Sequence, residues 1–146
     1  MMSSDPMKDA LRYLKYRLRS RREIEVQLFK KGYSEKEIKE VIEKLEEQGL
    51  VNDGIFARLY VSDGLNVHYK GPFRLRQELL GLGISEEVID DTIKLELDSC
   101  DLKEIGKRAA GNTELTDPDK IRRKLYRRGF SSSIIDEIIE EIKEKS

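Results

Sequence analysis

A triplet of glycine, a hydrophobic residue and serine occurs three times in the chain, and this repetition constrains the fold more than any other feature. The copies begin at Gly32, Gly83 and Gly129, at spacings of 51 and 46 residues. Hydrophobic residues recur at the same distances from each glycine, namely Ile24, Leu75 and Ile121; Leu28, Leu79 and Leu125; Ile38, Ile89 and Ile135; and Ile42, Ile93 and Ile139. Self-similarity at such a period indicates one structural unit used several times, so we predict three tandem repeats.

The residues around each triplet predict two helices joined by a tight turn. Hydrophobic residues four positions apart lie before and after each glycine, which places them on one face of a helix. Glycine readily adopts the left-handed conformation that follows a helix end. The serine of the triplet can cap the next helix by accepting a hydrogen bond from a free backbone N–H, and Ser34 with Glu37 has the spacing of a capping box.

Capping signals also mark where the first helix of each pair begins. Ser20 with Glu23 predicts a second capping box. Gly71-Pro72 and Asp117-Pro118 each place a cap residue before a proline. Proline favours the first helical position because its missing N–H has no partner there in any case. We therefore expect the first helices of the three pairs to start at these sites.

A third helix is predicted before each pair. The first starts at Asp5-Pro6, the second follows Asp53, and the third is short and covers roughly residues 102–110. The expected apolar residues are Met7, Leu11, Leu14 and Leu18 in the first of these helices, and Phe56, Ala57, Tyr60 and Val61 in the second.

The predicted fold is therefore all-α, an elongated array of three tandem three-helix repeats that resemble helix–turn–helix units. The repeats cover residues 5–50, 51–98 and 99–146. No segment has the pattern of a strand. A single unit of this size buries little surface, so we expect neighbouring repeats to stack and to stabilise one another.

Composition favours small cores under charged faces. Charged residues make up 39% of the chain and apolar residues 38%, whereas about a quarter of an average chain is charged. Cys100 is the only cysteine, which excludes an internal disulfide and suits a reducing compartment. No stretch approaches the roughly 20 apolar residues that span a bilayer, so we expect a cytoplasmic protein without a membrane partner.

Charge is sorted by helix within each repeat. The helix before each triplet tends to be basic, with Arg21, Arg22, Lys30, Lys31, Arg74, Arg76, Lys120, Arg122, Arg123, Lys124, Arg127 and Arg128. The helix after each triplet is acidic. If the helices stack in register, one edge of the body is basic and the other is acidic. A basic edge could follow phosphates or dock on an acidic protein groove. Alternatively, these charges form solvated faces stabilised by pairs four residues apart.

The residues do not predict a catalytic site. His68 is the only histidine, so a metal site with several histidines cannot form, and it is far from Cys100 in the sequence. Gly81-Leu82-Gly83 lacks the strand and the Lys-Ser/Thr of a phosphate loop. We therefore predict no enzyme activity, no cofactor and no metal. The acidic second helix of each pair also argues against sequence-specific binding of operator DNA, because in helix–turn–helix proteins the second helix enters the major groove.

Two ordered blocks of residues resemble a known family. They comprise Ser20-Arg21-Arg22-Glu23, Leu28, Gly32, Leu45, Gly49-Leu50-Val51-Asn52-Asp53, Phe56-Ala57, Tyr60, Lys70-Gly71-Pro72, Leu79 and Gly83-Ile84. This pattern resembles the signature of the RecX regulatory proteins. The resemblance covers about residues 10–97, while residues 101–143 share the architecture more than the motif.

The resemblance implies a monomeric, cytosolic bacterial protein that needs no cofactor. Such a protein lies along the groove of the RecA–DNA filament. There it modulates, and usually inhibits, RecA ATP hydrolysis, strand exchange and co-protease activity. It also implies weak, nonspecific DNA binding. The candidate contact residues are Arg17, Arg19, Arg21, Arg22, Lys70, Arg74, Arg76, Arg122, Arg123, Lys124, Arg127 and Arg128. The structural motif residues are Ser20, Glu23, Gly32, Asn52, Asp53, Gly71, Gly83 and Gly129.

Within that motif, Asn52-Asp53 is expected to cap the following helix, and Lys70-Gly71 to allow a close approach of helices. One departure from the family is Ser62-Asp63-Gly64, where relatives commonly carry basic residues. Phosphate contacts are therefore expected from the first and third repeats. The alternatives are a stand-alone DNA-binding protein and a helical scaffold for another partner.

Overall fold

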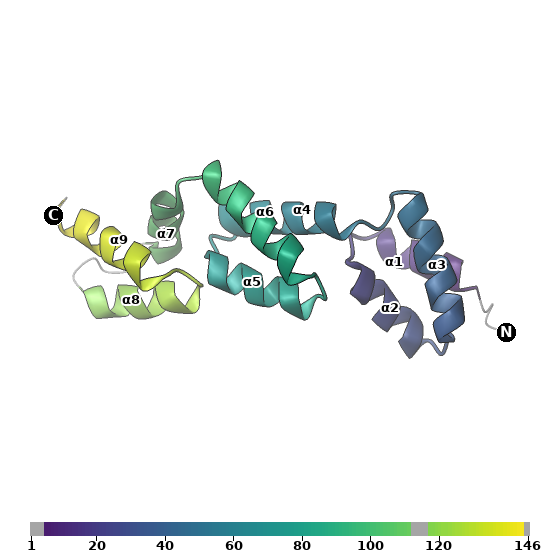
Figure 1. Ribbon diagram of the computed structural model, residues 1–146. Helices are drawn as coiled ribbons and strands as arrows, with labels where there is room; N and C mark the ends of the chain where they lie inside the picture. Colours follow the sequence, from purple (N-terminus) through teal and green to yellow (C-terminus); the bar gives the residue numbers. More distant parts are fainter. Residues whose placement is uncertain (1–4, 112–116, 145–146) are drawn as a thin grey trace.

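The computed structural model describes residues 5–111 and 117–144, and within them it contains nine helices and no strand (Figure 1). The helices are α1 (Pro6–Leu14), α2 (Arg21–Lys30), α3 (Glu35–Glu47), α4 (Asp53–Asn66), α5 (Pro72–Gly81), α6 (Glu86–Asp98), α7 (Leu102–Ala110), α8 (Pro118–Arg127) and α9 (Ser132–Glu144). They form three groups of three along an elongated body, with α1–α3 at one end and α7–α9 at the other. The predicted all-α array of three-helix repeats is confirmed.

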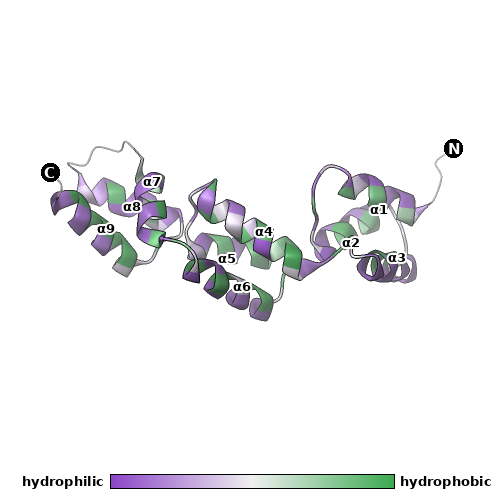
Figure 2. Cartoon of the chain, turned by 90° about the horizontal axis from the view of Figure 1, so that it is seen from above, coloured by the Kyte–Doolittle hydropathy of each residue, from purple (hydrophilic) through white to green (hydrophobic). Residues whose placement is uncertain are grey.

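The turns and caps form as the sequence predicts. Gly32, Gly83 and Gly129 each have a φ between 84° and 97°, which is the left-handed region where a side chain would be strained. Ser20 and Ser34 both form complete capping boxes at the starts of α2 and α3. The side chain of Asn52 caps α4 by accepting a hydrogen bond from the N–H of Ile55. Figure 2 shows hydrophilic and hydrophobic residues interspersed along the helices, as expected for amphipathic helices.

The expected apolar stripe of the first helix is partly wrong. Leu11 is 43% exposed, and Leu18, which follows the end of α1, is 48% exposed. Ala10 is the fully buried residue of α1 instead, with Met7 and Leu14 packed beside it. Because α1 has only nine residues, its inward face is narrow, and a small residue lets it approach α2 and α3 closely.

The buried residues form two cores rather than one for each repeat. One core lies inside repeat 1 and is built around Ile24, Leu28 and Leu45. The other core is continuous through repeats 2 and 3 and contains Leu75 of repeat 2 and Phe130 of repeat 3. Repeats 2 and 3 therefore share buried apolar surface, whereas polar groups contribute to the join between repeats 1 and 2.

The same type of contact joins both pairs of neighbouring repeats. Between repeats 1 and 2, the Ser20 hydroxyl donates to the carbonyl of Leu82 at 2.7 Å. Between repeats 2 and 3, the N–H of Gly71 donates to the carbonyl of Arg128 at 2.7 Å. Each carbonyl directly precedes a triplet glycine, and each donor is the cap residue of the preceding repeat's second helix. The triplet turn of one repeat is thus hydrogen-bonded to the start of the second helix in the repeat before it.

Glycine at position 71 is required by this contact. A Cβ atom built there would lie 2.6 Å from the backbone nitrogen of Phe130, and it would also collide with the carbonyl group of Gly129. The expected close approach at Lys70-Gly71 is therefore present, and the group that approaches is the turn of the next repeat.

Candidate partner-binding surface

The second helices of the three repeats, α2, α5 and α8, lie in a row along one long edge of the body, the lower edge in Figure 1. This row follows from the repeated contact between each turn and the preceding helix start. It brings the three segments with the candidate basic residues to one edge, as the stacking of repeats in register requires.

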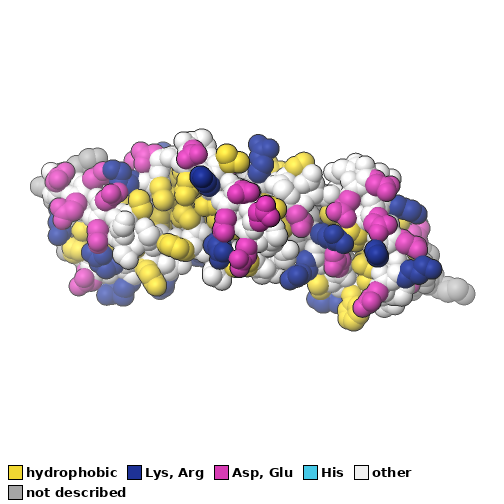
Figure 3. All heavy atoms as spheres, viewed as in Figure 1, with side chains coloured by type: hydrophobic (Ala, Val, Ile, Leu, Met, Phe, Trp, Pro, Cys, Tyr) yellow, Lys and Arg dark blue, Asp and Glu magenta, His cyan; other side chains and the backbone are white. Residues whose placement is uncertain are grey.

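The edge is not uniformly basic, because several of its cations pair with acids on the neighbouring third helix. Arg76 lies 3.0 Å from Asp90, and Arg122 lies 2.5 Å from Asp136. Each arginine stands seven residues before its triplet glycine and each aspartate seven after, so the pair is a repeated feature of the hairpin. Figure 3 shows dark blue and magenta side chains intermingled over this face. The expectation of separate basic and acidic edges is wrong for this face.

Several candidate residues stabilise the middle of the array. Glu78 accepts hydrogen bonds from Lys70 at 2.9 Å, from Arg74 at 3.1 Å and from the Tyr60 hydroxyl at 2.8 Å. Burial opposes the charge on Glu78, but these donors keep its pKa below the ordinary value. Burial, together with the bond to Glu78, raises the pKa of Tyr60 to about 12. The Tyr60 hydroxyl therefore joins α4 to α5 through Glu78, Lys70 fastens the connecting segment to α5, and the pair of Arg74 and Glu78 lies within α5.

The basic residues before α2 are also engaged within the fold. Arg17 forms an ion pair with Glu23 at 2.5 Å. The guanidinium of Arg19 lies 3.8 Å from the centre of the Tyr13 ring, and its Nε donates to the Tyr13 carbonyl. Arg21 pairs with Glu25 at 2.8 Å. The contacts of Arg17 and Arg19 fix the segment that connects α1 to α2, whereas the pair of Arg21 and Glu25 lies within α2.

Two basic residues at the third repeat have structural partners. Arg128 donates to the carbonyls of Tyr69 and His68, so it fastens repeat 3 to repeat 2. Lys124 donates to the carbonyl of Ala110 at 3.1 Å, which ties α8 to the end of α7. Substitution of Arg128 would therefore disturb the junction between repeats as well as any surface charge.

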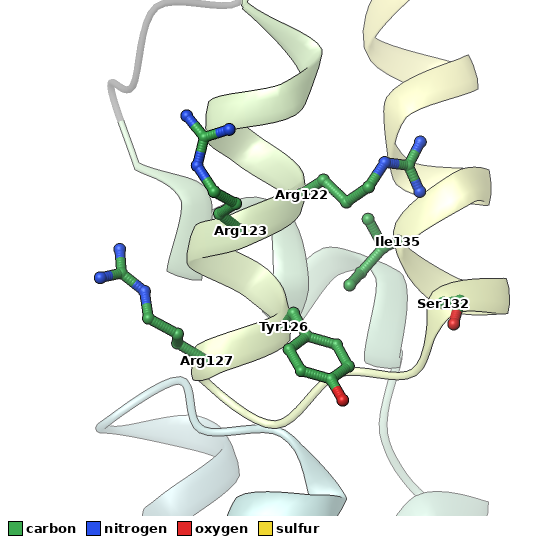
Figure 4. Close-up of a pocket in the computed structure, with 6 residues that line it drawn as sticks. All are labelled: Arg122, Arg123, Tyr126, Arg127, Ser132 and Ile135. Carbon is green, nitrogen blue, oxygen red and sulfur yellow. The ribbon is translucent and has the colours of Figure 1, made fainter.

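Three candidate residues remain free of hydrogen bonds and ion pairs in residues 5–111 and 117–144, namely Arg22, Arg123 and Arg127. All three are exposed. Arg123 and Arg127 are one helical turn apart on α8, and Figure 4 shows both side chains extending to the same side of that helix. Arg58, on the outer face of α4, is also exposed and unpaired within the described residues. The candidates named from the sequence did not include Arg58, because it is the only cation in α4 and belongs to no basic cluster.

Two hollows lie between the second and third helices, one in repeat 1 and one in repeat 3. The hollow in repeat 3 has a volume of about 460 Å³ and is lined by Arg122, Arg123, Tyr126, Arg127, Ser132 and Ile135 (Figure 4). The hollow in repeat 1 has a volume of about 630 Å³ and is lined by Arg21, Glu25, Val26, Phe29, Lys30, Glu35, Ile38, Lys39 and Ile42. Sequence reasoning named neither Phe29 nor Tyr126. The sequence signal that could have identified them is an aromatic residue three positions before the triplet glycine.

Metal-binding groups and the single cysteine bear on the chemistry available to the residues that the structure describes. No group of three or more His, Cys, Asp or Glu residues among them could hold a metal ion. Burial raises the pKa of the Cys100 thiol, which disfavours the reactive thiolate. None of the helices in the described parts of the chain is both long and apolar enough to cross a bilayer.

The fold therefore defines a class, the all-helical tandem-repeat proteins. Residues 7–45 match the family described as RecX, first three-helix domain, and residues 52–93 match RecX, second three-helix domain. The chain belongs to the RecX family of regulatory proteins.

Relatives and solved structures agree with this assignment. The regulatory protein RecX of Thermotoga maritima is 36% identical over 142 residues, which cover 97% of this chain and 87% of the relative. RecX of Bacillus subtilis is 36% identical over 144 residues, which cover 91% of this chain but 53% of that longer protein. The crystal structure of RecX from Lactobacillus salivarius superimposes with a TM-score of 0.81 at 33% identity, covering 94% of both chains.

Proposed function

We propose that this chain binds the RecA–DNA filament as a monomer in the bacterial cytosol, lies along its helical groove, and inhibits RecA ATP hydrolysis, strand exchange and co-protease activity. The observation that carries the proposal is the row formed by α2, α5 and α8 along one edge of an elongated body. A long edge can contact several subunits of a filament at once, whereas a compact domain of this size would contact one or two.

The free arginines suit this partner. Arg22 on α2 and the pair Arg123 and Arg127 on α8 are exposed on the two outer helices of the row. A guanidinium without an internal partner can form short, charge-assisted hydrogen bonds to a carboxylate or a phosphate. The paired arginines would first have to give up an existing ion pair. We therefore assign the main electrostatic contacts to these three residues.

Weak, nonspecific DNA binding is a second candidate function, favoured by Arg123 and Arg127 in particular. Each phosphate neutralised by a protein cation adds roughly −0.9 to the slope of log affinity against log salt concentration for duplex DNA. If these two residues contact phosphates, the double variant Arg123→Glu/Arg127→Glu should show a slope less steep by about 2 than the wild type.

The test measures RecA ATPase activity and co-sedimentation of the chain with RecA–DNA filaments, and separately its affinity for DNA alone. The variant is Arg123→Glu/Arg127→Glu. Lys36→Glu/Lys44→Glu on α3 is the matched control, because it makes the same change in charge at exposed residues. Arg128 is left unchanged because it holds repeats 2 and 3 together.

We expect wild type and control to sediment with filaments and slow ATP hydrolysis, and the arginine variant to do both less well. If the wild type neither sediments with filaments nor changes ATPase activity, the proposal is wrong. If the variant loses affinity for bare DNA but inhibits RecA like the wild type, these two arginines serve DNA binding and inhibition depends on protein contacts elsewhere.

A further inference from the structure

Repeats 1 and 3 carry an equivalent surface feature that repeat 2 lacks. Phe29 and Tyr126 both stand three residues before a triplet glycine, and they are 68% and 71% exposed. The residue that follows is a cation in both cases, Lys30 and Arg127. In repeat 2 the equivalent of the aromatic residue is Leu80, which packs against the shared core, and Gly81 stands in the place of the cation.

Each exposed aromatic side chain borders one of the two hollows between second and third helices. Buried isoleucines of the third helices lie beneath them, Ile38 and Ile42 in repeat 1 and Ile135 in repeat 3, with exposures of 7%, 1% and 1%. Figure 4 shows the Tyr126 ring and Ile135 flanking the space between α8 and α9. An aromatic wall over an aliphatic floor is suited to receive an apolar side chain, because both surfaces lose contact with water when it binds.

The charges around the hollows favour an acidic partner. Lys30 and Lys39 at the first hollow, and Arg123 and Arg127 at the second, are exposed and have no ion pair within the described residues. Of the two acids at the first hollow, Glu25 is neutralised by Arg21 at 2.8 Å, and Glu35 lies at the helix start. Among the described residues that line the second hollow there is no acid. The apolar floors favour a protein side chain over a phosphate, which would lose hydration there.

We infer that the two hollows bind the same epitope on two subunits of a protein filament, and that this epitope is an apolar side chain within an acidic segment. The inference rests on the proposed function, in which the partner is a polymer of identical subunits. Two equivalent hollows on one rigid body bind a repeating partner with an avidity that exceeds either single affinity by about 10²–10⁴-fold. A monomeric partner gains no such advantage.

The experiment compares binding of Phe29→Ala, Tyr126→Ala and the double variant to two forms of RecA. One form is the assembled filament on DNA, and the other is a RecA variant that cannot polymerise. Tyr16→Ala is the matched control, because Tyr16 is an aromatic residue between α1 and α2 that is 78% exposed, lines neither hollow and lies outside the row of second helices. Affinities are measured by fluorescence anisotropy of labelled chain, and helix content by circular dichroism confirms that each variant is folded.

We expect each single substitution to weaken filament binding by about 100-fold, because it removes the second point of attachment. The same substitution should weaken binding to monomeric RecA by only about twofold, because one of two equivalent sites remains. The double variant should bind neither form, and Tyr16→Ala should bind both like the wild type.

Three results would overturn the inference. Filament binding unchanged in both single variants would show that the hollows are not used, while the proposed function would stand on the binding of the wild type. Equal losses on filament and monomer would show one site rather than two. Loss of affinity for bare single-stranded DNA in both single variants, with RecA binding intact, would make the hollows nucleic-acid sites. A wild type that binds no filament would remove the proposed function together with this inference.

Discussion

Substitution of Gly71 by alanine tests whether the hydrogen-bonded triplet turn holds repeats 2 and 3 together. The backbone of Gly71 has φ −82°, which any residue can adopt, so the substitution introduces no strain in the residue itself. The added methyl group instead meets the carbonyl group of Gly129 and lies 2.6 Å from the nitrogen of Phe130. Both are backbone atoms that cannot rotate away, so the turn of repeat 3 must move.

The cost can be worked out from the contacts that this movement disturbs. Overpacking of one methyl group costs about 1–3 kcal/mol. The turn also accepts hydrogen bonds from the N–H groups of Gly71 and Phe73, at 2.7 and 3.0 Å, and each contributes about 1 kcal/mol. Partial loss of both brings the expected destabilisation to about 2–4 kcal/mol. For a chain of this length that lowers the unfolding midpoint by about 10 °C.

The assay is thermal unfolding followed by circular dichroism, with Gly81→Ala as the control. Gly81 is the last residue of α5, and a Cβ atom there would meet no atom within 4 Å. Because alanine favours helix over glycine, the control should gain up to about 1 kcal/mol. The reasoning is refuted if Gly71→Ala unfolds within 2–3 °C of the wild type, a shift of about 1 kcal/mol, or if both variants respond alike.

Two further predictions concern individual side chains. Ser20→Ala should cost about 2 kcal/mol in urea unfolding, because it removes a cap and leaves the Leu82 carbonyl without its donor; Ser34→Ala removes only a cap and should cost about half as much. Hydrogen bonds from Lys107 and Lys103 lower the pKa of Glu141 to about 2 from an ordinary value of 4.5. A depressed carboxyl pKa stabilises the folded state above the unfolded pKa and ceases to do so as pH falls through the folded pKa. The difference in unfolding midpoint between wild type and Glu141→Gln should therefore be constant above about pH 5, shrink as pH falls towards the folded pKa and disappear below it; a difference that persists well below the folded pKa would show that another interaction causes it.

The fold could be predicted because its signals are local. The three glycine turns and the capping serines act within a few residues of their own positions, so their spacing in the sequence is sufficient to place the helices. The shared core of repeats 2 and 3 could not be predicted, because it depends on how closely Gly71 and Gly129 allow two turns to approach. The exposure of Leu11 was missed for a related reason, since the length of α1 and the packing of Ala10 decide which face turns inward.

The sequence predicted the alignment of the basic segments but not the partners of each cation within them. The basic segments do lie in one row, but the sequence could not show which cations are already paired. Arg122 and Arg128 look alike in the sequence, yet one faces Asp136 on α9 and the other donates to backbone carbonyls of repeat 2. Helix packing determines this difference. The hollows beside Phe29 and Tyr126 likewise depend on how the second and third helices pack, which the sequence does not show.

In the proposed function, the row of second helices lies against a RecA filament. Cryo-electron microscopy of RecA–DNA filaments with and without the chain tests it most directly. We predict added density in the helical groove, rod-shaped and as long as three repeats, with α2, α5 and α8 turned towards the filament. Filaments whose groove stays empty at saturating concentrations of the chain, or density confined to the filament ends, would contradict the account.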